Sequence, residues 1–199
     1  EKCKNKGWAT ESIANLSAPL KYGSSTKLEY IESGVPFLRI ADISRYRFDF
    51  DEIKYISFEA AQEESLQAKV KFGDVLISRT GTLGLSVAIP KELENSVFGS
   101  YMIRVRPQNN AVDSTYLSLY LNSMAGKLQV EQTNTGAIQT NLTIPVIEAI
   151  RIVIPPNDVQ KMFAKEVEKS FIAQDEAKRL LAEAKEEVER LKKEGKSLK

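Results

Sequence analysis

Histidine is absent from this chain of 199 residues, and cysteine occurs once, at Cys3. Because zinc sites and histidine-based acid–base or triad chemistry need these side chains, the sequence excludes both within the chain. A single cysteine cannot form an internal disulfide, which fits a reducing cytoplasmic setting. Carboxylates, lysines and tyrosines leave another kind of catalytic centre open, but no pair of them stands out. We expect neither a catalytic residue nor a metal ligand.

Long apolar runs and an excess of one charge are also missing. No uninterrupted apolar stretch is long enough to cross a bilayer, and no signal peptide is recognisable. Up to Asn157 the chain has 17 Lys and Arg against 17 Asp and Glu, and beyond it 11 against 10. Neither part is a basic tail that coats nucleic acid without specificity. Any DNA contact must therefore come from basic residues that the fold brings together.

The most informative segment is residues 72–84, FGDVLISRTGTLG. Its pattern predicts a turn, a short buried strand and then a small-residue loop that contains Arg79. Hydroxyl groups flank this arginine at Ser78, Thr80 and Thr82. Glycine lets such a backbone approach another surface closely, and the arginine fork suits bidentate contacts to phosphates or guanine edges. The alternative is a β-turn with one surface arginine.

Residues 1–156 are predicted to form one domain of the α+β class, with short strands and interspersed helices. Runs rich in Val, Ile, Phe or Tyr predict strands at 36–40, 54–56, 74–78, 86–89, 101–106 and 150–154. Apolar spacing predicts helices at 8–16, with Thr10 as N-cap, at 59–66 and at 114–130. Arg104 and Arg106 alternate with apolar residues, which assigns them to the outer face of their strand.

The composition changes at Pro155 and Pro156, and residues 157–199 contain almost no glycine or proline. A helix is predicted from residue 158 to about residue 194, about 55 Å long at the helical rise. Its apolar residues follow a four–three spacing at Ala177, Leu181, Ala184, Val188 and Leu191, and Phe163 and Val167 extend the series backwards. This spacing is typical of a coiled-coil seam. The alternative is a solvated helix that serves as a linker.

Five segments, in order, resemble the specificity subunit of type I restriction–modification systems. They are GVPFLRIADI (34–43), KFGDVLISR (71–79), FGSYMIRV (98–105), GAIQTNL (136–142) and IVIPPNDVQ (152–160). The resemblance covers nearly the whole chain. It implies a recognition domain built around a twisted, barrel-like sheet that binds one half of a split double-stranded DNA target, followed by a conserved spacer helix.

The resemblance also implies the partners. The long helix would pair antiparallel with a second such helix and dock methyltransferase and restriction subunits, and S-adenosylmethionine would bind the methyltransferase subunit. A full specificity subunit carries two recognition domains and two helices, whereas this chain shows one of each and no internal repeat. We therefore expect a homodimer, or pairing with a second half, through residues 158–191.

The DNA-contacting residues are expected on loops. Arg, Lys, Asn and Gln contact base edges, whereas Ser, Thr and Tyr anchor phosphates. A small polar loop offers Tyr22, Ser24, Ser25, Thr26 and Lys27, and a later polar loop offers Asn134, Gln139 and Asn141. Arg39 would contact DNA or form an ion pair with Asp42 or Asp74. Gln139 would bond an adenine edge or cap a turn, and Arg45 would contact DNA or lie on the solvent face of a hairpin.

Three other functions stay open at this stage. The chain could be an interaction adaptor whose β-rich domain binds a protein, or the recognition domain of a fused type II restriction–methyltransferase. It could also be an enzyme that uses lysine or carboxylates. Residues 154–157 (IPPN) resemble the base-holding motif of amino-methyltransferases only superficially, because Asn157 follows the prolines and no aromatic residue comes next. We expect a non-catalytic subunit.

Overall fold

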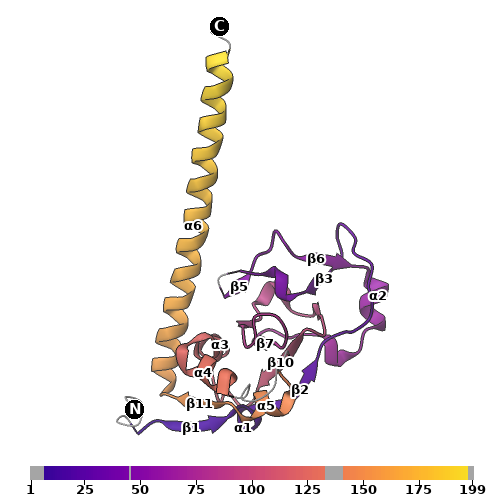
Figure 1. Cartoon of the computed structure of the whole chain (residues 1–199), viewed down its shortest axis with the longest axis vertical. Coiled ribbons are helices and arrows are strands. Elements are labelled where there is room, and N and C mark those ends of the chain that lie inside the picture. The colour runs from indigo at the N-terminus through magenta and orange to yellow at the C-terminus, as the bar shows by residue number, and fades with distance from the viewer. Residues whose placement is uncertain (1–6, 45, 133–140, 197–199) are drawn as a thin grey trace. The chain divides into compact units, whose positions relative to one another are not determined.

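The computed structural model describes residues 7–44, 46–132 and 141–196, with side chains described as far as Lys193. The chain divides into two compact units, Glu1–Lys161 and Met162–Lys199. The described strands all lie in the first unit, and most of the long helix α6 (Asn157–Lys196) forms the second (Figure 1). The α+β class is confirmed.

The largest sheet of the first unit is antiparallel, with strand order β2-β10-β7-β8. Its strands are β2 (Ser17–Tyr22), β10 (Met102–Pro107), β7 (Val75–Ser78) and β8 (Ser86–Ala88). Ile103 of β10 lies opposite Tyr22 on one side and Ile77 on the other. Strand β10 is thus central, and the ends of β2 and β7 lie on either side of its first residues.

The described residues form three smaller sheets as well. The first has strand order β6-β3-β9, from β6 (Lys54–Ile56), β3 (Val35–Leu38) and β9 (Val97–Phe98), with β3 and β9 parallel. The other two pair β4 (Ile43–Ser44) with β5 (Arg47–Phe48), and β1 (Ala9–Ser12) with β11 (Arg151–Ile154). Within the described residues no sheet closes on itself, so the expected barrel-like sheet is corrected to several open sheets.

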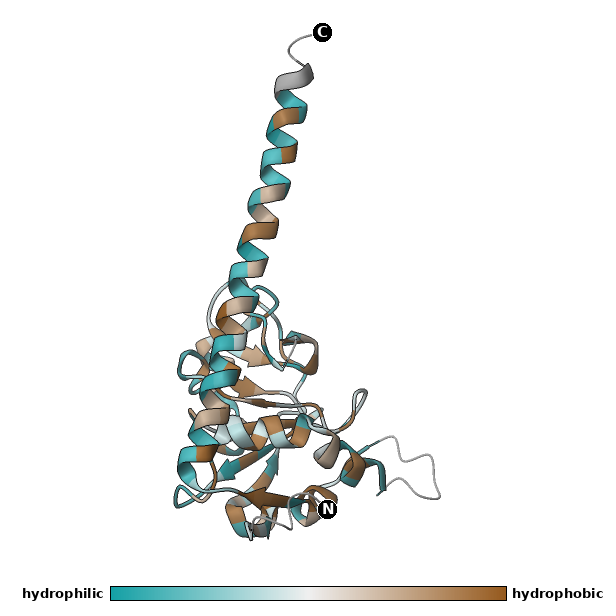
Figure 2. Cartoon of the chain, turned by 90° about the vertical axis from the view of Figure 1, so that its left-hand side faces the viewer, coloured by the Kyte–Doolittle hydropathy of each residue, from teal (hydrophilic) through white to brown (hydrophobic). Residues whose placement is uncertain are grey.

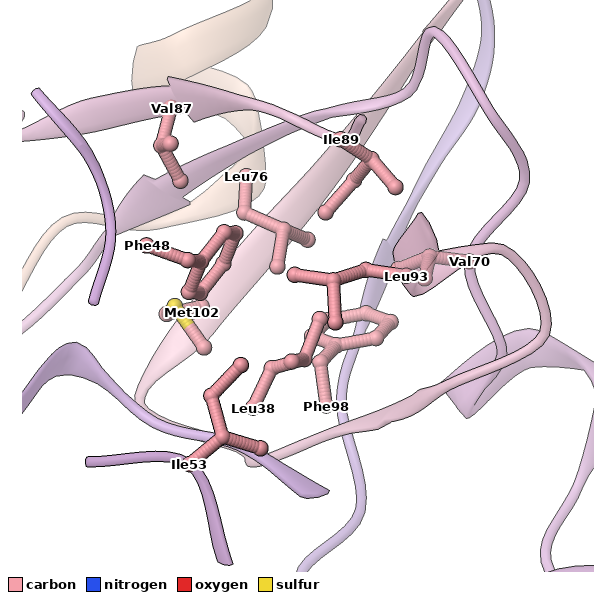
Figure 3. Packing of buried hydrophobic residues seen from close by; sticks show 10 residues of the cluster. All are labelled: Leu38, Phe48, Ile53, Val70, Leu76, Val87, Ile89, Leu93, Phe98 and Met102. Atoms are coloured by element: carbon pink, nitrogen blue, oxygen red, sulfur yellow. The ribbon is translucent and has the colours of Figure 1, made fainter. Parts of the chain in front are cut away.

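The main hydrophobic core lies between the four-stranded and three-stranded sheets (Figure 3). Leu76 and Met102 point into it from the first sheet, and Leu38 and Phe98 point into it from the second. A smaller cluster centres on Phe37, Ile56 and Val97. Burial of these apolar side chains is the main force that holds the sheets together.

Short helices cover the sheets. They are α1 (Ile13–Leu16), α2 (Phe58–Glu63), α3 (Ser114–Asn122), α4 (Met124–Gln132) and α5 (Ile144–Ala149), with 3-10 turns η2 (Ile40–Asp42), η3 (Leu66–Ala68) and η4 (Lys91–Leu93). The single helix predicted over 114–130 is wrong, because it breaks at Ser123. There the backbone is extended, and the Ser123 hydroxyl donates to the carbonyl of Tyr120 at 2.6 Å.

The helix predicted over residues 8–16 is also wrong in its first half. Residues 9–12 form β1 against β11, and only Ile13–Leu16 is helical, with Ser12 rather than Thr10 as its N-cap. The other predicted strands and helices are present: the strand at 54–56 matches at both ends, and the remaining ends lie within three residues of the predicted ones.

The outer-face assignment of Arg104 and Arg106 is overturned. Arg104 lies opposite Leu76, on the sheet face that packs against the second sheet, and is only 6 % exposed. Its guanidinium donates to the carbonyls of Gln67 and Lys69, and Arg106 forms a two-point ion pair with Asp74. Both faces of β10 are buried, so its alternation does not separate core from solvent.

Helix α6 is one uninterrupted helix, as predicted, and begins directly after the two prolines. Hydrophobic positions recur along it between charged ones (Figure 2). Leu181, Val188 and Leu191 are each more than half exposed. Charged residues of α6 form ion pairs along the helix, such as that between Arg179 and Glu176. No described helix is both long enough and apolar enough to cross a membrane.

Candidate nucleic-acid interface

Three loops meet at one end of the four-stranded sheet, and we call residues 22–27, 79–84 and 99–101 the loop cluster. The backbone N–H of Ser24 donates to the Phe98 carbonyl at 2.8 Å, and that of Ser100 donates to the Ser24 carbonyl at 2.7 Å. The backbone N–H of Arg79 donates to the Tyr101 carbonyl at 2.9 Å. Main-chain bonds therefore fix the three loops relative to one another.

Gly23 makes this close approach possible. A Cβ atom at this position would lie 2.3 Å from the Phe98 carbonyl oxygen and 2.4 Å from that of Gly99. Both are backbone atoms, and shifting them to make room for a side chain would disturb the main chain of the neighbouring loop. Only glycine allows the 22–27 loop to lie against β9 and the loop that follows it.

Arg79 stacks on Tyr22. The guanidinium carbon lies 4.8 Å from the centre of the Tyr22 ring, which is within the range of a cation–π contact. The Tyr22 hydroxyl accepts a hydrogen bond from the Ile144 N–H at 3.4 Å, and the Arg79 carbonyl accepts one from Leu142 at 2.8 Å. The segment that contains Leu142 and Ile144 is thus attached to the same cluster.

Arg79 differs from the other described arginines of the first unit. Arg39, Arg104, Arg106 and Arg151 all donate to protein acceptors, and Arg47 also has a partner. Within the described residues the Arg79 guanidinium contacts only the Tyr22 ring and donates no hydrogen bond, and its Nε, like that of Arg104, is buried without an acceptor. A partly buried guanidinium that donates to no protein acceptor at all is more typical of a ligand site than of a structural brace.

The other loop residues have mixed roles. Ser25, Thr26 and Lys27 are exposed, as is Thr82, and Thr80 is half-buried. Ser78 is fully buried and its hydroxyl donates to the Thr82 carbonyl, which closes the 79–84 loop around Gly81 at φ +67°. Ser78 therefore shapes the loop. It has no exposed surface with which to touch a ligand.

Arg39 matches the ion-pair alternative. Its guanidinium makes a bidentate contact with Asp42, which is fully buried, and donates to the Glu52 carbonyl at 3.0 Å. The hydrogen bonds to Asp42 raise the pKa of Arg39 above its ordinary value. The arginine therefore braces η2, and its backbone N–H also donates to Asp42 Oδ2 at 2.8 Å.

Three predicted residues, Arg45, Asn134 and Gln139, lie outside the described residues. Asn141 is described, is half-buried and directly precedes Leu142, whose N–H bonds to Arg79. Within the described residues no group of His, Cys, Asp and Glu side chains is arranged to hold a metal ion.

A hollow of about 450 Å³ lies beside the cluster. Residues 20–26 form one wall, and the end of α2 with η3 forms another through Glu64, Ser65 and Gln67. Ser24 links the two walls, because its hydroxyl donates to Glu64 Oε1 at 2.7 Å. Sequence reasoning missed Glu64, Gln67 and Tyr101, which is 66 % exposed, because only long-range pairing brings them here.

The family model described as "Type I restriction modification DNA specificity domain" matches residues 6–189. The EcoBI specificity subunit of Escherichia coli is 23 % identical over 164 residues, which is 82 % of this chain and 34 % of that protein. The chain thus spans about a third of the length of this curated relative.

Two solved structures of type I specificity subunits are also similar to this chain. The HsdS subunit from Thermoanaerobacter tengcongensis matches with a TM-score of 0.63 at 19 % identity, over 93 % of this chain and 47 % of that one. The type I restriction–modification S subunit from M. genitalium gives 0.57 at 16 % identity, over 91 % and 44 %. At these identities the likeness establishes a shared fold. Together with the family match over residues 6–189, it shows that this chain belongs to the type I restriction–modification DNA specificity family.

Proposed function

We propose that the chain recognises one half of a bipartite double-stranded DNA sequence as the specificity component of a type I restriction–modification enzyme. The first unit would contact DNA through the loop cluster. Catalysis would belong to the methyltransferase and restriction subunits that the chain directs to the site, with S-adenosylmethionine on the methyltransferase. Such an enzyme would act on DNA in the cytoplasm. The family match and the lack of histidine support a non-catalytic role.

The observation that carries this proposal is Arg79. Its guanidinium has no protein acceptor within the described residues, and its stacking on Tyr22 limits its rotation. A fork held in this way loses little conformational freedom when it forms two hydrogen bonds to a guanine edge or a phosphate. Exposed Ser25, Thr26 and Lys27 on the adjacent loop supply phosphate contacts.

Helix α6 would join two such halves. Its exposed seam residues Leu181, Val188 and Leu191 favour a partner helix, because a regular apolar stripe stabilises a helix only when a partner covers it. We propose a two-fold homodimer, or pairing with a second half, in which the antiparallel helices set the spacing between the two DNA half-sites.

Arg79→Ala tests the DNA assignment. In a complex with the methyltransferase subunits, we expect the variant to lose preference at one base pair, at a cost of roughly 1–3 kcal/mol. Lys91→Ala is the matched control, because it removes one positive charge beside Phe72, at the other end of β7. Equal affinity and equal sequence preference for the two variants, with normal thermal unfolding, would remove Arg79 from the interface.

A further inference from the structure

Glu64 is the one acidic side chain among the described residues that line the hollow. It directly follows α2 and faces a wall that otherwise offers Lys21, Ser25 and Thr26. Lysine and hydroxyl groups suit a phosphate backbone, whereas a carboxylate is repelled by it. If DNA approaches this wall, Glu64 therefore needs a different partner from its neighbours.

The position of the Glu64 carboxylate is fixed. The hydroxyl of Ser24, which is buried, donates to Oε1 at 2.7 Å and accepts from the Thr26 N–H at 3.1 Å. The backbone of Ser24 is itself held on both sides, by Phe98 and Ser100. Since a carboxylate has two oxygens and accepts several hydrogen bonds, this arrangement orients the group and leaves Oε2 to accept from a ligand.

A carboxylate only accepts hydrogen bonds. On the major-groove edges of base pairs, the donors are the exocyclic amino groups, N4 of cytosine and N6 of adenine. Guanine and thymine offer acceptors at the corresponding positions and would be repelled by a carboxylate. One charged group can therefore favour its target base and also reject the wrong ones.

We propose that Glu64 is a specificity-determining residue that accepts a hydrogen bond from the exocyclic amino group of a base, with cytosine N4 as the favoured partner. The proposal rests on the proposed DNA-recognition function and adds to it the chemical identity of one base contact. Glu64 and Arg79 would lie on the same side of the domain, since both flank residues 22–24: Glu64 contacts Ser24, and Arg79 contacts Tyr22.

Glu64→Gln isolates the charge. Glutamine keeps an acceptor oxygen for the Ser24 hydroxyl, but it adds an amide that donates to guanine or thymine. With the full chain, its methyltransferase partner subunits and a randomised duplex library, we expect the wild type to select cytosine or adenine at one position. The variant should lose that selection by roughly 5- to 160-fold, as expected for one specific base contact.

Non-specific binding gives a second readout. Removing a negative charge beside phosphates should leave the affinity for unrelated duplex unchanged or higher, whereas removing a phosphate contact lowers it. Glu63→Gln is the matched control, because Glu63, the last residue of α2 and the direct neighbour of Glu64, is exposed and does not line the hollow. Its base preference should equal that of the wild type.

Two results would overturn the proposal. If Glu64 only braces Ser24 against the end of α2, Glu64→Gln should select the same bases as the wild type, and the proposed DNA-recognition function would stand without this contact. If the wild-type complex shows no sequence preference at all, the DNA-recognition function fails together with the Glu64 assignment.

Discussion

Asp74, which directly precedes β7, and Arg106 of the neighbouring strand β10 form a two-point ion pair, with Nε to Oδ1 at 2.6 Å and Nη2 to Oδ2 at 2.7 Å. The Asp74 carboxylate is buried and also accepts from the Lys71 N–H at 2.8 Å. Arg104 lies nearby, with its Nε 3.9 Å from Oδ2, and its pKa is lowered by burial and by the charge of Arg106. The single negative charge of Asp74 therefore lies beside the positive charges of both Arg104 and Arg106.

Asp74→Asn should destabilise the first unit severely. The substitution leaves two buried or half-buried guanidinium groups without a counter-charge, and breaking a buried pair costs roughly 3–5 kcal/mol. The free energy of unfolding from a denaturant titration measures the loss. Glu92→Gln, which removes an exposed carboxylate, should change this free energy by less than about 0.5 kcal/mol. A loss for Asp74→Asn as small as that of the control would contradict the structural role of the pair.

Gln160→Ala should also destabilise the first unit. The buried side chain of Gln160 accepts from the Asp113 N–H at 2.8 Å and donates to the Pro155 carbonyl at 2.9 Å, so it joins the first turn of α6 to the N-cap of α3. Alanine leaves both backbone groups unsatisfied, at a cost of roughly 1–3 kcal/mol. Chemical denaturation measures the free energy of unfolding of this variant and of the control Gln62→Ala, which lies at an exposed position of α2. Equal stability of the two variants would show that water replaces both bonds.

Replacement of Leu181 and Val188 with aspartate should give monomers. Two charges in the seam would be buried against a partner helix without counter-ions, which a coiled coil does not tolerate. Analytical ultracentrifugation at tens of micromolar measures the mass. Ile172→Asp is the control. Continuing the four–three spacing from Ala177 back to Val167 puts Ser170 and Gln174 in the seam, so Ile172, midway between them and exposed, lies on the opposite side of the helix.

The monomeric variant should keep its fold, because these side chains lie in the second unit. Its first unit should still unfold cooperatively. A wild-type chain that sediments as a monomer would contradict the homodimer and leave pairing with a separate second half.

Local patterns predicted the elements that depend on neighbours in sequence. The two prolines and the four–three spacing predicted α6, and β-branched runs between turn residues predicted β7 and β6. Errors arose where a distant partner decides the structure. Residues 9–12 form a strand only because β11, about 140 residues later, pairs with them, and both faces of β10 are covered by elements that the alternation in its own sequence does not reveal.

The candidate site followed the same rule. The loops around Tyr22 and Arg79 were predicted separately from their composition, but their contact depends on the register of β2 and β7 against β10. Glu64 was not predicted, since its link to Ser24 spans 40 residues and has no local signal. The ion pair of Arg39 with Asp42 was one of two predicted alternatives, because their spacing of three residues allows the contact.

A salt titration of duplex binding tests the central claim most directly. The chain, assembled with its methyltransferase subunits, is titrated with a duplex that carries its selected sequence, from about 50 to 200 mM salt. If the loop cluster binds DNA, the logarithm of the binding constant should fall linearly with the logarithm of salt concentration, with a slope of about −0.9 for each phosphate contacted. No duplex binding even at the lowest salt would contradict DNA recognition and favour an adaptor that binds protein instead.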